Sequence, residues 1–380
     1  MNNTKLRNFK DAIARRNFLE KSLKINLKSI AATVISENQV SGKNIENFIG
    51  GGQIPLGIAG PIIIKSDSKK SSHFVPLATT EGALVASVSR GIKAINASGG
   101  ADVYIEKVGT SRSPVFKTEN IKHSKQVEKF IGKNFASLEK IASQTSSHLK
   151  LISHSTKIIG TSIYVRFSFD TQDAMGMNMA TIATDSLAKF IETKTKAGCI
   201  SIAGNFDVDK KPSYLNFLCG RGIMAWAETT LKKEIVKEVL KTTPKQLVET
   251  VYRKCLLGSI VSGTLGANAH HANIIAAIFL ATGQDAAHVV EGSIGTTTAE
   301  VTNNGNLYFS VYLPALMLGT VGGGTHLPTQ SEAIRIMQVK NPEKFAEVAV
   351  AAVLAGELSL LASQTEGTLA KAHQKLGRKK

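Results

Sequence analysis

The sequence predicts a mixed α/β (α+β) fold in which a small unit is inserted into a large, helix-rich unit. The chain has 380 residues, which is more than one hydrophobic core usually holds, so at least two units are expected. Residues 161–169 alternate apolar and polar side chains, as half-buried strands do. Residues 177–194 then carry a broad apolar stripe at helical spacing. Helix and strand patterns of this kind fill residues 115–200 and mark the inserted unit.

The composition is that of a soluble globular protein. Apolar residues make up 43% of the chain and charged residues 20%. The longest apolar run near the C-terminus, residues 348–356, lies between Glu347 and Glu357 and is far shorter than the ~18 residues that a membrane span needs. The N-terminus is polar and basic and lacks the apolar region of a signal peptide. We therefore expect a cytoplasmic protein without a membrane segment.

The cysteines and histidines predict neither a disulfide framework nor a metal site. The three cysteines show no Cys-x-x-Cys spacing and are Cys199, Cys219 and Cys255. The adjacent His270 and His271 resemble metal ligands, but no second pair stands at ligand spacing. Core packing or substrate contact explains the two histidines better, and no metal is expected.

The net charge of +17 is concentrated in three segments, residues 1–30, 113–160 and 371–380. Such segments can bind nucleic acid, can steer a polyanionic small substrate, or can simply be solvated lysine faces. The sequence contains no basic stripe interleaved with aromatic residues and no helix-turn-helix pattern. We therefore expect no nucleic-acid partner, and the other two interpretations stay open.

Helical and extended patterns alternate in the first part of the chain. Residues 4–40 carry apolar side chains at helical spacing among many charges, and we assign residues 1–49 to an N-terminal helical region. Glycines and prolines in residues 45–61 exclude a helix and allow extended segments with tight turns. Residues 103–110 have the pattern of a strand, and a lysine-rich helix is expected near residues 123–145.

Two charged residues in this part have both a structural and a functional interpretation. Thr79 or Thr80 can cap a helix that begins near Glu81, where a carboxylate is an ordinary capping charge. Small residues as far as Gly91 predict that this helix packs closely against another element. Arg112, in a turn after the strand, can bind a planar carboxylate through its guanidinium, or can be a surface arginine.

The stretch 173–179, Asp-Ala-Met-Gly-Met-Asn-Met, carries the chain from the strand into the helix. Gly176 lets a ligand approach the backbone closely, and the free N–H groups of the helix attract anions. This geometry suits the phosphates of a cofactor, although it is not the three-glycine dinucleotide fingerprint. Methionines beside a glycine are also ordinary core filler, so the residues alone leave both interpretations open.

Three later loops contain residues with potential chemistry. Residues 203–211 combine glycine, acidic residues and adjacent lysines, the composition of a solvated turn. Asp285 directly follows Gly283-Gln284 and is a good helix N-cap. Residues 319–325 form a second glycine-rich loop, which by itself is unspecific.

Together these stretches resemble the 3-hydroxy-3-methylglutaryl-coenzyme A reductases. The motifs occur in the order of that family: Thr-Thr-Glu-Gly at 79–82, Asp-Ala-Met-Gly-Met-Asn-Met at 173–179, Asp-Lys-Lys-Pro at 209–212, Gly-Gln-Asp at 283–285 and Gly-Thr-Val-Gly-Gly-Gly-Thr at 319–325. The resemblance extends over residues 4–378. The Asp-Lys-Lys-Pro loop is typical of the class I enzymes.

The resemblance implies a domain arrangement. A small ferredoxin-like dinucleotide-binding domain, residues 113–202, is inserted into a large substrate-binding domain of residues 50–112 and 212–380. Residues 203–211 would form the catalytic lysine loop. In the family this loop completes a neighbouring subunit's site, so we expect a homodimer or homotetramer with the active site at the interface.

The resemblance also implies the reaction. The thioester 3-hydroxy-3-methylglutaryl-coenzyme A would be reduced to mevalonate and free coenzyme A by two hydride transfers from NADPH, and NADH is not excluded. Lys210 would stabilise the oxyanion, and Glu81 would donate a proton, which requires its neutral form. Asp285 would tune both groups, and His373 would protonate the departing coenzyme A thiolate.

Further contacts follow from the same resemblance. Substrate contacts are implied for Ser87, Arg90, Arg112, Asp209, Lys211, Lys254 and Asn273. Cofactor contacts are implied for Asp173, Met175, Gly176, Met177, Asn178, Gly322, Gly323, Gly324 and Thr325. Ala203 stands where family members usually have a serine that contacts the substrate carboxylate, so one hydrogen bond is in doubt.

Overall fold

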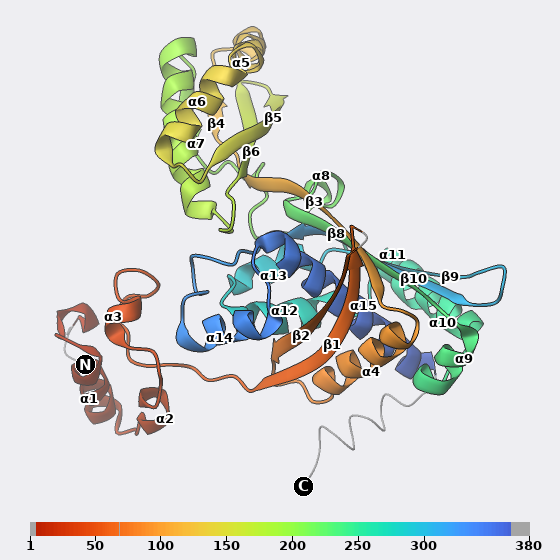
Figure 1. Ribbon diagram of the computed structural model, residues 1–380. Coiled ribbons are helices and arrows are strands. Elements are labelled where there is room, and N and C mark those ends of the chain that lie inside the picture. Colours follow the sequence, from red (N-terminus) through yellow and green to blue (C-terminus); the bar gives the residue numbers. More distant parts are fainter. Residues whose placement is uncertain (1–4, 68, 366–380) are drawn as a thin grey trace.

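The computed structural model describes residues 5–67 and 69–365, and two large hydrophobic clusters organise them. The larger cluster draws its buried residues from two stretches, Ala59 to Val103 and Ile223 to Ala362. The smaller cluster runs from Phe116 to Ala197. Figure 1 shows the corresponding two bodies, with the smaller one above the larger one. The exact domain boundaries stay predictions, but each cluster falls inside one of the two predicted ranges.

The smaller body has the predicted ferredoxin-like topology. Its elements follow the order β–α–β–β–α–β, with two consecutive helices in the first helical position: β4 (Val115–Lys117), α5 (Ile121–Lys133), α6 (Phe135–Thr145), β5 (Lys150–Ile159), β6 (Ser162–Asp170), α7 (Met177–Thr195) and β7 (Gly198–Ser201). The strands pair antiparallel in the order β7-β4-β6-β5. This is the split β–α–β arrangement.

The lysine-rich helix expected near residues 123–145 is two helices. They meet at Asn134, whose backbone (φ −108°, ψ 22°) leaves the helical region. The Asn134 side chain donates a 2.8 Å hydrogen bond to the carbonyl of Phe130. Asparagine interrupts helices because its side chain competes with the backbone for such partners, and the periodicity of the apolar residues did not reveal this break.

The larger body contains a sheet with the strand order β2-β1-β3-β8-β10-β9. Its strands are β1 (Leu56–Ser66), β2 (Lys69–Ala78), β3 (Ala101–Arg112), β8 (Gly222–Leu231), β9 (Thr296–Val301) and β10 (Leu307–Leu316). β1 and β3 pair parallel, and the other neighbours pair antiparallel. β3 joins the two bodies, because its first part pairs with β8 and its last three residues pair with β6 (Figure 1).

Two helices, α4 (Leu84–Ala97) and α15 (Pro342–Thr365), pack closely in the larger body. A Cβ atom at Gly91 would lie 1.9 Å from the carbonyl oxygen of Ala355, so only glycine permits this approach. The predicted close contact of the small-residue helix is confirmed. The predicted start near Glu81 is wrong, because Ala83 is left-handed (φ 73°) and the helix begins only at Leu84.

Helix α15 is longer and more apolar than the sequence pattern suggested. It is long and apolar enough to cross a membrane, but 94% of its most apolar window is buried inside the protein. Glu347 and Glu357, which seemed to bound the apolar run, lie within the helix and are themselves buried. Both carboxylates have polar partners: Lys344 and Ser66 for Glu347, and backbone N–H groups of Ala269 and His270 for Glu357.

The N-terminal region is helical only in pieces. It contains η1 (Leu6–Asn8), α1 (Ala12–Leu23), α2 (Lys28–Ala31) and α3 (Glu37–Val40), held by a small cluster of Ala12, Val40 and Phe48. The remaining helices belong to the larger body and its connections: α8 (Tyr214–Cys219), α9 (Lys233–Ile235), the π-helical η2 (Val236–Leu240), α10 (Pro244–Thr250), the π-helical η3 (Val251–Leu257), α11 (Gly258–Ser262), α12 (His271–Thr282), η4 (Ala286–His288), α13 (Val289–Gly292) and α14 (Pro328–Met337).

Candidate active site

A cleft of about 640 Å³ brings together residues from both bodies. We call it the Lys210 cleft. Its lining comes from the end of β3, the turn before α7, the loop before α8, the loop after α12 and the glycine-rich loop before α14. The lining residues are Arg112, Ala174, Met175, Gly176, Met177, Asn178, Met179, Asp209, Lys210, Gly283, Gln284, Asp285, Gly319, Val321, Gly322, Gly323, Gly324, Thr325 and Leu327. Segments far apart in the sequence therefore share one concave surface.

One wall of the cleft is built by the two glycine-rich motifs. The carbonyl oxygen of Asp173 accepts hydrogen bonds from the N–H groups of Thr320 (2.9 Å) and Val321 (3.3 Å). A Cβ atom at Gly319 would lie 2.5 Å from the backbone nitrogen of Met175, so glycine allows the two segments to touch. Gly176 is the left-handed N-cap (φ 86°) of the 19-residue helix α7. The first N–H groups of such a helix have no partner within it and favour anions.

Across the cleft, Lys210 and Asp285 form an ion pair. The Nζ atom of Lys210 lies 2.7 Å from Oδ2 of Asp285, and both side chains are partly exposed. Burial alone would raise the pKa of Asp285, but hydrogen bonds from Lys210 and from the Ala287 N–H outweigh it and hold the pKa below its ordinary value. Asp285 also caps η4, so its predicted N-cap role is confirmed.

Arg112 is the last residue of β3 and so does not lie in a turn. Its Nη1 atom lies 3.1 Å from Oδ2 of buried Asp207 and 3.7 Å from Oδ2 of Asp209. Its Nε and Nη2 atoms both donate to the hydroxyl of Thr181 on α7. The guanidinium is thereby fixed at the border between the two bodies, where it lines the cleft.

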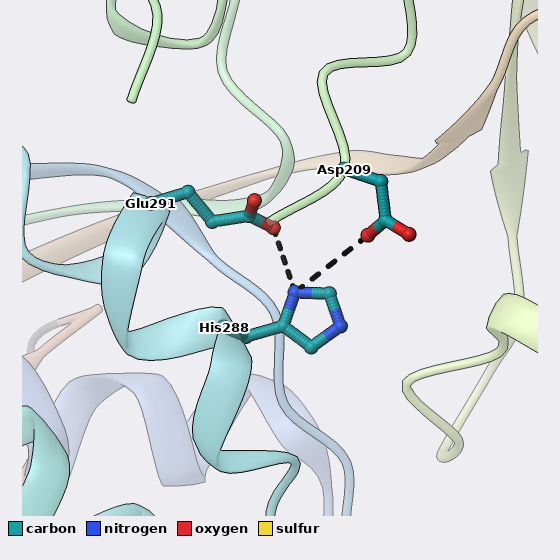
Figure 2. Close-up of side chains that lie close together, drawn as sticks. All are labelled: Asp209, His288 and Glu291. Carbon is teal, nitrogen blue, oxygen red and sulfur yellow. Dashed lines mark hydrogen bonds and ion pairs between the residues drawn. The ribbon is translucent and has the colours of Figure 1, made fainter. Parts of the chain in front are cut away.

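Beneath the Lys210–Asp285 pair lies a buried polar cluster that sequence reasoning missed. Arg221 and Glu291 are fully buried and hydrogen-bonded, and Arg221 also pairs with Asp209 at 3.1 Å. Figure 2 shows His288 between Glu291 and Asp209, with its Nδ1 atom 2.8 Å from Glu291 and 4.0 Å from Asp209. The sequence offered one signal for this cluster: a charged residue stands beside glycine within an apolar segment at Gly220-Arg221-Gly222 and at Glu291-Gly292.

The same cluster has the spacing of a metal site. One ligand atom each from Asp209, His288 and Glu291 lies within 4.8 Å of the others. However, the guanidinium of Arg221 already binds a carboxylate oxygen of both Glu291 and Asp209. A buried carboxylate needs a compensating positive charge, and here an arginine supplies it.

Comparison with known proteins identifies the family. The family profile described as hydroxymethylglutaryl-coenzyme A reductase matches residues 11–378. The chain belongs to this family. The 3-hydroxy-3-methylglutaryl-coenzyme A reductase of Pyrococcus abyssi is 47% identical over 374 residues, which cover 96% of this chain and 92% of the relative. The enzyme of the same name from Methanocaldococcus jannaschii is 48% identical over 373 residues, with the same coverage. Like these relatives, the chain is an oxidoreductase.

Solved structures of reductases share the fold. A class II 3-hydroxy-3-methylglutaryl-CoA reductase from Streptococcus pneumoniae, in a structure bound to NADPH, matches 93% of this chain and 97% of its own with a TM-score of 0.72. Its sequence is 18% identical, so this likeness concerns the fold alone. These class II structures and the archaeal relatives do not support the class I label.

Not every residue that the family resemblance implied lies in the Lys210 cleft. Among the described residues, the predicted members that do not line it are Glu81, Ser87, Arg90, Asp173, Lys211, Lys254 and Asn273. The Glu81 side chain is exposed in the turn before α4. Ser87 and Arg90 hydrogen-bond to Ser359 on α15. His373 lies outside the described residues.

Two further predicted residues occupy other places. Lys254 lines a separate hollow of about 530 Å³ beside α11, and Asn273 is half-buried on α12. Neighbouring His271 is fully buried and its Nε2 atom lies 3.0 Å from the hydroxyl of Thr297. Burial lowers the pKa of His271 to about 4. His271 therefore packs in the core as a neutral residue.

Proposed function

We propose that this protein reduces 3-hydroxy-3-methylglutaryl-coenzyme A to mevalonate and free coenzyme A, with NADPH as the hydride donor, as a step of the mevalonate pathway. The observation that carries the proposal is the Lys210 cleft. It joins both glycine-rich family motifs to the Lys210–Asp285 pair within one space. An anion-attracting helix terminus and a fixed ammonium are what a phosphate-bearing cofactor and a developing oxyanion require.

The wall formed by the two glycine-rich motifs fits the proposed cofactor. Gly322 and Gly323 have positive φ angles, and a Cβ atom at either would meet no described atom within 4 Å, so the space beside their Cα atoms is open to a ligand. NADPH, when bound, supplies the hydride. The residues proposed to hold it are Asp173, Met175, Gly176, Met177, Asn178, Gly322, Gly323, Gly324 and Thr325. The NADPH-bound streptococcal structure is consistent with this choice over NADH.

The opposite side of the cleft is proposed to bind and activate the thioester. Lys210 would donate a charged hydrogen bond to the oxygen that becomes negative as the carbonyl is reduced. Asp285, held ionised by its partners, would keep Lys210 charged and in place. Arg112 would bind the free carboxylate of the acyl group through its fork of N–H donors. Asp209 and Lys211, the neighbours of Lys210 in the loop, would complete these contacts.

Two proton donors are proposed, Glu81, which does not line the cleft of the described chain, and His373, which lies outside the described residues. Glu81 would protonate the alkoxide of the second reduction, and His373 the departing thiolate. The exposed position of Glu81 supports a site that is completed by a second copy of the chain, as a homodimer or homotetramer. Ser87, Arg90, Lys254 and Asn273 would contribute substrate contacts from the same side as Glu81.

The test is a cofactor-oxidation assay with the purified protein. We expect loss of NADPH absorbance only when the thioester is added, and mevalonate and free coenzyme A as products. A Lys210→Ala variant with the same thermal stability serves as the control for contaminating reductases. A wild-type protein that oxidises neither NADPH nor NADH in response to the thioester would refute the proposal.

A further inference from the structure

The loop that carries Lys210 is held in a conformation that its residues disfavour. Asn205, Val208 and Lys210 all have positive φ angles, of 65°, 52° and 56°. Asparagine tolerates left-handed backbone, but it is unfavourable for lysine and a clear outlier for a β-branched valine. Such strain persists only where the surroundings enforce it. The contacts that hold this loop therefore determine where the Lys210 ammonium lies.

Glu291 on α13 makes the contact at Lys210 itself. Its Oε2 atom accepts the backbone N–H of Lys210 at 2.6 Å. Its Oε1 atom binds the guanidinium of Arg221 and lies 2.8 Å from Nδ1 of His288, which must carry the proton because a carboxylate only accepts. Glu291 is fully buried and does not line the cleft. The two carboxylate oxygens of Glu291 thus accept hydrogen bonds from three donors.

His288, which hydrogen-bonds to Glu291, also lies near the other end of Lys210. The Nε2 atom of His288 is buried, has no hydrogen-bond partner among the described residues, and lies 3.8 Å from Oδ2 of Asp285. The same oxygen of Asp285 is 2.7 Å from Nζ of Lys210. Glu291 therefore contacts the backbone of Lys210 directly, and its partner His288 packs beside the carboxylate that pairs with the Lys210 ammonium without hydrogen-bonding to it.

We propose that Glu291 is the positioning residue of Lys210, holding the strained backbone of the loop and thereby the place of its ammonium. Arg221 anchors Glu291 in turn, because it is fully buried and donates to the hydroxyl of Ser111 on β3 at 3.0 Å. Arg221 thereby ties Glu291 to the strand that carries Arg112. This inference rests on the role proposed above for Lys210.

The main test is the variant Glu291→Gln. Glutamine has nearly the same volume, but its single carbonyl oxygen cannot accept from all three donors that the two carboxylate oxygens serve. Because misplacing a reacting group by about 1 Å can cost ~10²-fold in rate, we expect kcat to fall by about 10²-fold while KM for the thioester changes only a few-fold. Glu347→Gln is the matched control. Glu347 is a buried, ion-paired glutamate away from the cleft, and its variant should keep the wild-type kcat.

A second variant covers the case in which Glu291→Gln does not fold. Glu291→Asp keeps the negative charge beside Arg221 but withdraws it by one methylene from the N–H of Lys210. We expect it to remain folded and to lose kcat in the same direction as Glu291→Gln. Wild-type kcat in a folded Glu291 variant would overturn the proposal, as would an equal loss in Glu347→Gln.

A measurement without turnover separates positioning from general damage. Trypsin can cleave the bond between Lys210 and Lys211, whereas the bond before Pro212 resists it. We expect cleavage after Lys210 to be several-fold faster in the Glu291 variants and unchanged in Glu347→Gln, with thermal stability checked in parallel. An unchanged cleavage rate in a folded Glu291 variant would overturn the positioning role. If the wild-type protein lacks reductase activity, the proposed function fails, and the cleavage rate still decides whether Glu291 holds the loop.

Discussion

The Lys210 cleft and the region around α4 differ in how complete they are within one chain. In the cleft, every predicted charged residue has a partner at short range: Lys210 has Asp285, Arg112 has Asp207, and Asp209 has Arg221. Near α4, the predicted proton donor Glu81 is exposed and lies away from that cleft. The charged residues predicted around Lys210 are thus paired within one chain, whereas Glu81 does not lie beside them.

The largest expected effect tests whether a second copy closes this gap. Lys210→Ala and Glu81→Gln should each be inactive alone. If the cleft of one subunit uses Glu81 of another, subunit exchange between the two variants creates one intact site in each mixed dimer. Random exchange should then restore about one quarter of the wild-type activity.

The control for subunit exchange is the double variant Lys210→Ala/Glu81→Gln, mixed with Lys210→Ala. That mixture contains no intact site and should stay inactive. Persistent inactivity of the first mixture, with exchange demonstrated by native mass spectrometry, would mean that both regions serve the same chain.

The next effect distinguishes the two proposed proton donors, Glu81 and His373. His373→Gln should lose about 10²–10⁴-fold in turnover of the thioester, because the thiolate then lacks its acid. The same variant should keep most of its activity with free mevaldehyde, since no thiolate leaves. Glu81→Gln should lose both activities. Equal losses of both activities in His373→Gln would show that the histidine organises the whole site.

A smaller effect compares how much the buried Arg221–Glu291 pair and the exposed Arg253–Glu249 pair contribute to stability. Arg221→Met leaves Glu291 buried without its cation, so we expect the free energy of unfolding to fall by about 3–5 kcal/mol. Arg253→Met removes an exposed partner of Glu249 and should cost at most about 0.5 kcal/mol. Urea unfolding of both variants provides the comparison. Equal losses would show that the buried cluster contributes no more than a surface pair.

The smallest effect separates the two regions by pH. The pKa of His271, beside α15, is lowered by burial from 6.5 to about 4 in the folded protein, so the unfolded state binds protons first. Stability should therefore be full above pH 6.5 and fall by up to about 3 kcal/mol between pH 6.5 and pH 4. In the cleft, the pKa of Asp285 is lowered from 3.8 in the folded protein. The ionised carboxylate therefore stabilises the fold above pH 3.8, and this stabilisation is lost as the pH falls through the lower pKa of the folded state.

Replacement of each group tests this separation. His271→Asn should flatten the slope of stability between pH 6.5 and pH 4, and Asp285→Asn should alter only the more acidic range. A wild-type slope in His271→Asn would contradict the assignment of this window to His271.

Local patterns predicted several elements well. The strand before the Asp173–Met179 turn and the helix after it are β6 and α7, because period-2 and helical apolar patterns depend only on neighbouring residues. Asp285 as an N-cap follows from equally local chemistry. The family resemblance also named many of the residues that line the cleft, including Lys210 and Asp285, together with seven described residues that do not line it. Their roles stay predictions.

By itself, the sequence determined the periodic elements, the glycines that permit close approach, and the family. Tertiary structure alone decided which charges meet. His288 and Glu291 are three residues apart in one helical segment, but Arg221 lies about 70 residues earlier. No local pattern could therefore predict that Arg221 joins them in one buried cluster beneath Lys210. The same holds for α15, whose glutamates looked like the ends of an apolar run until packing provided them with partners. Burial and pairing depend on long-range contacts, and these exist only in the folded chain.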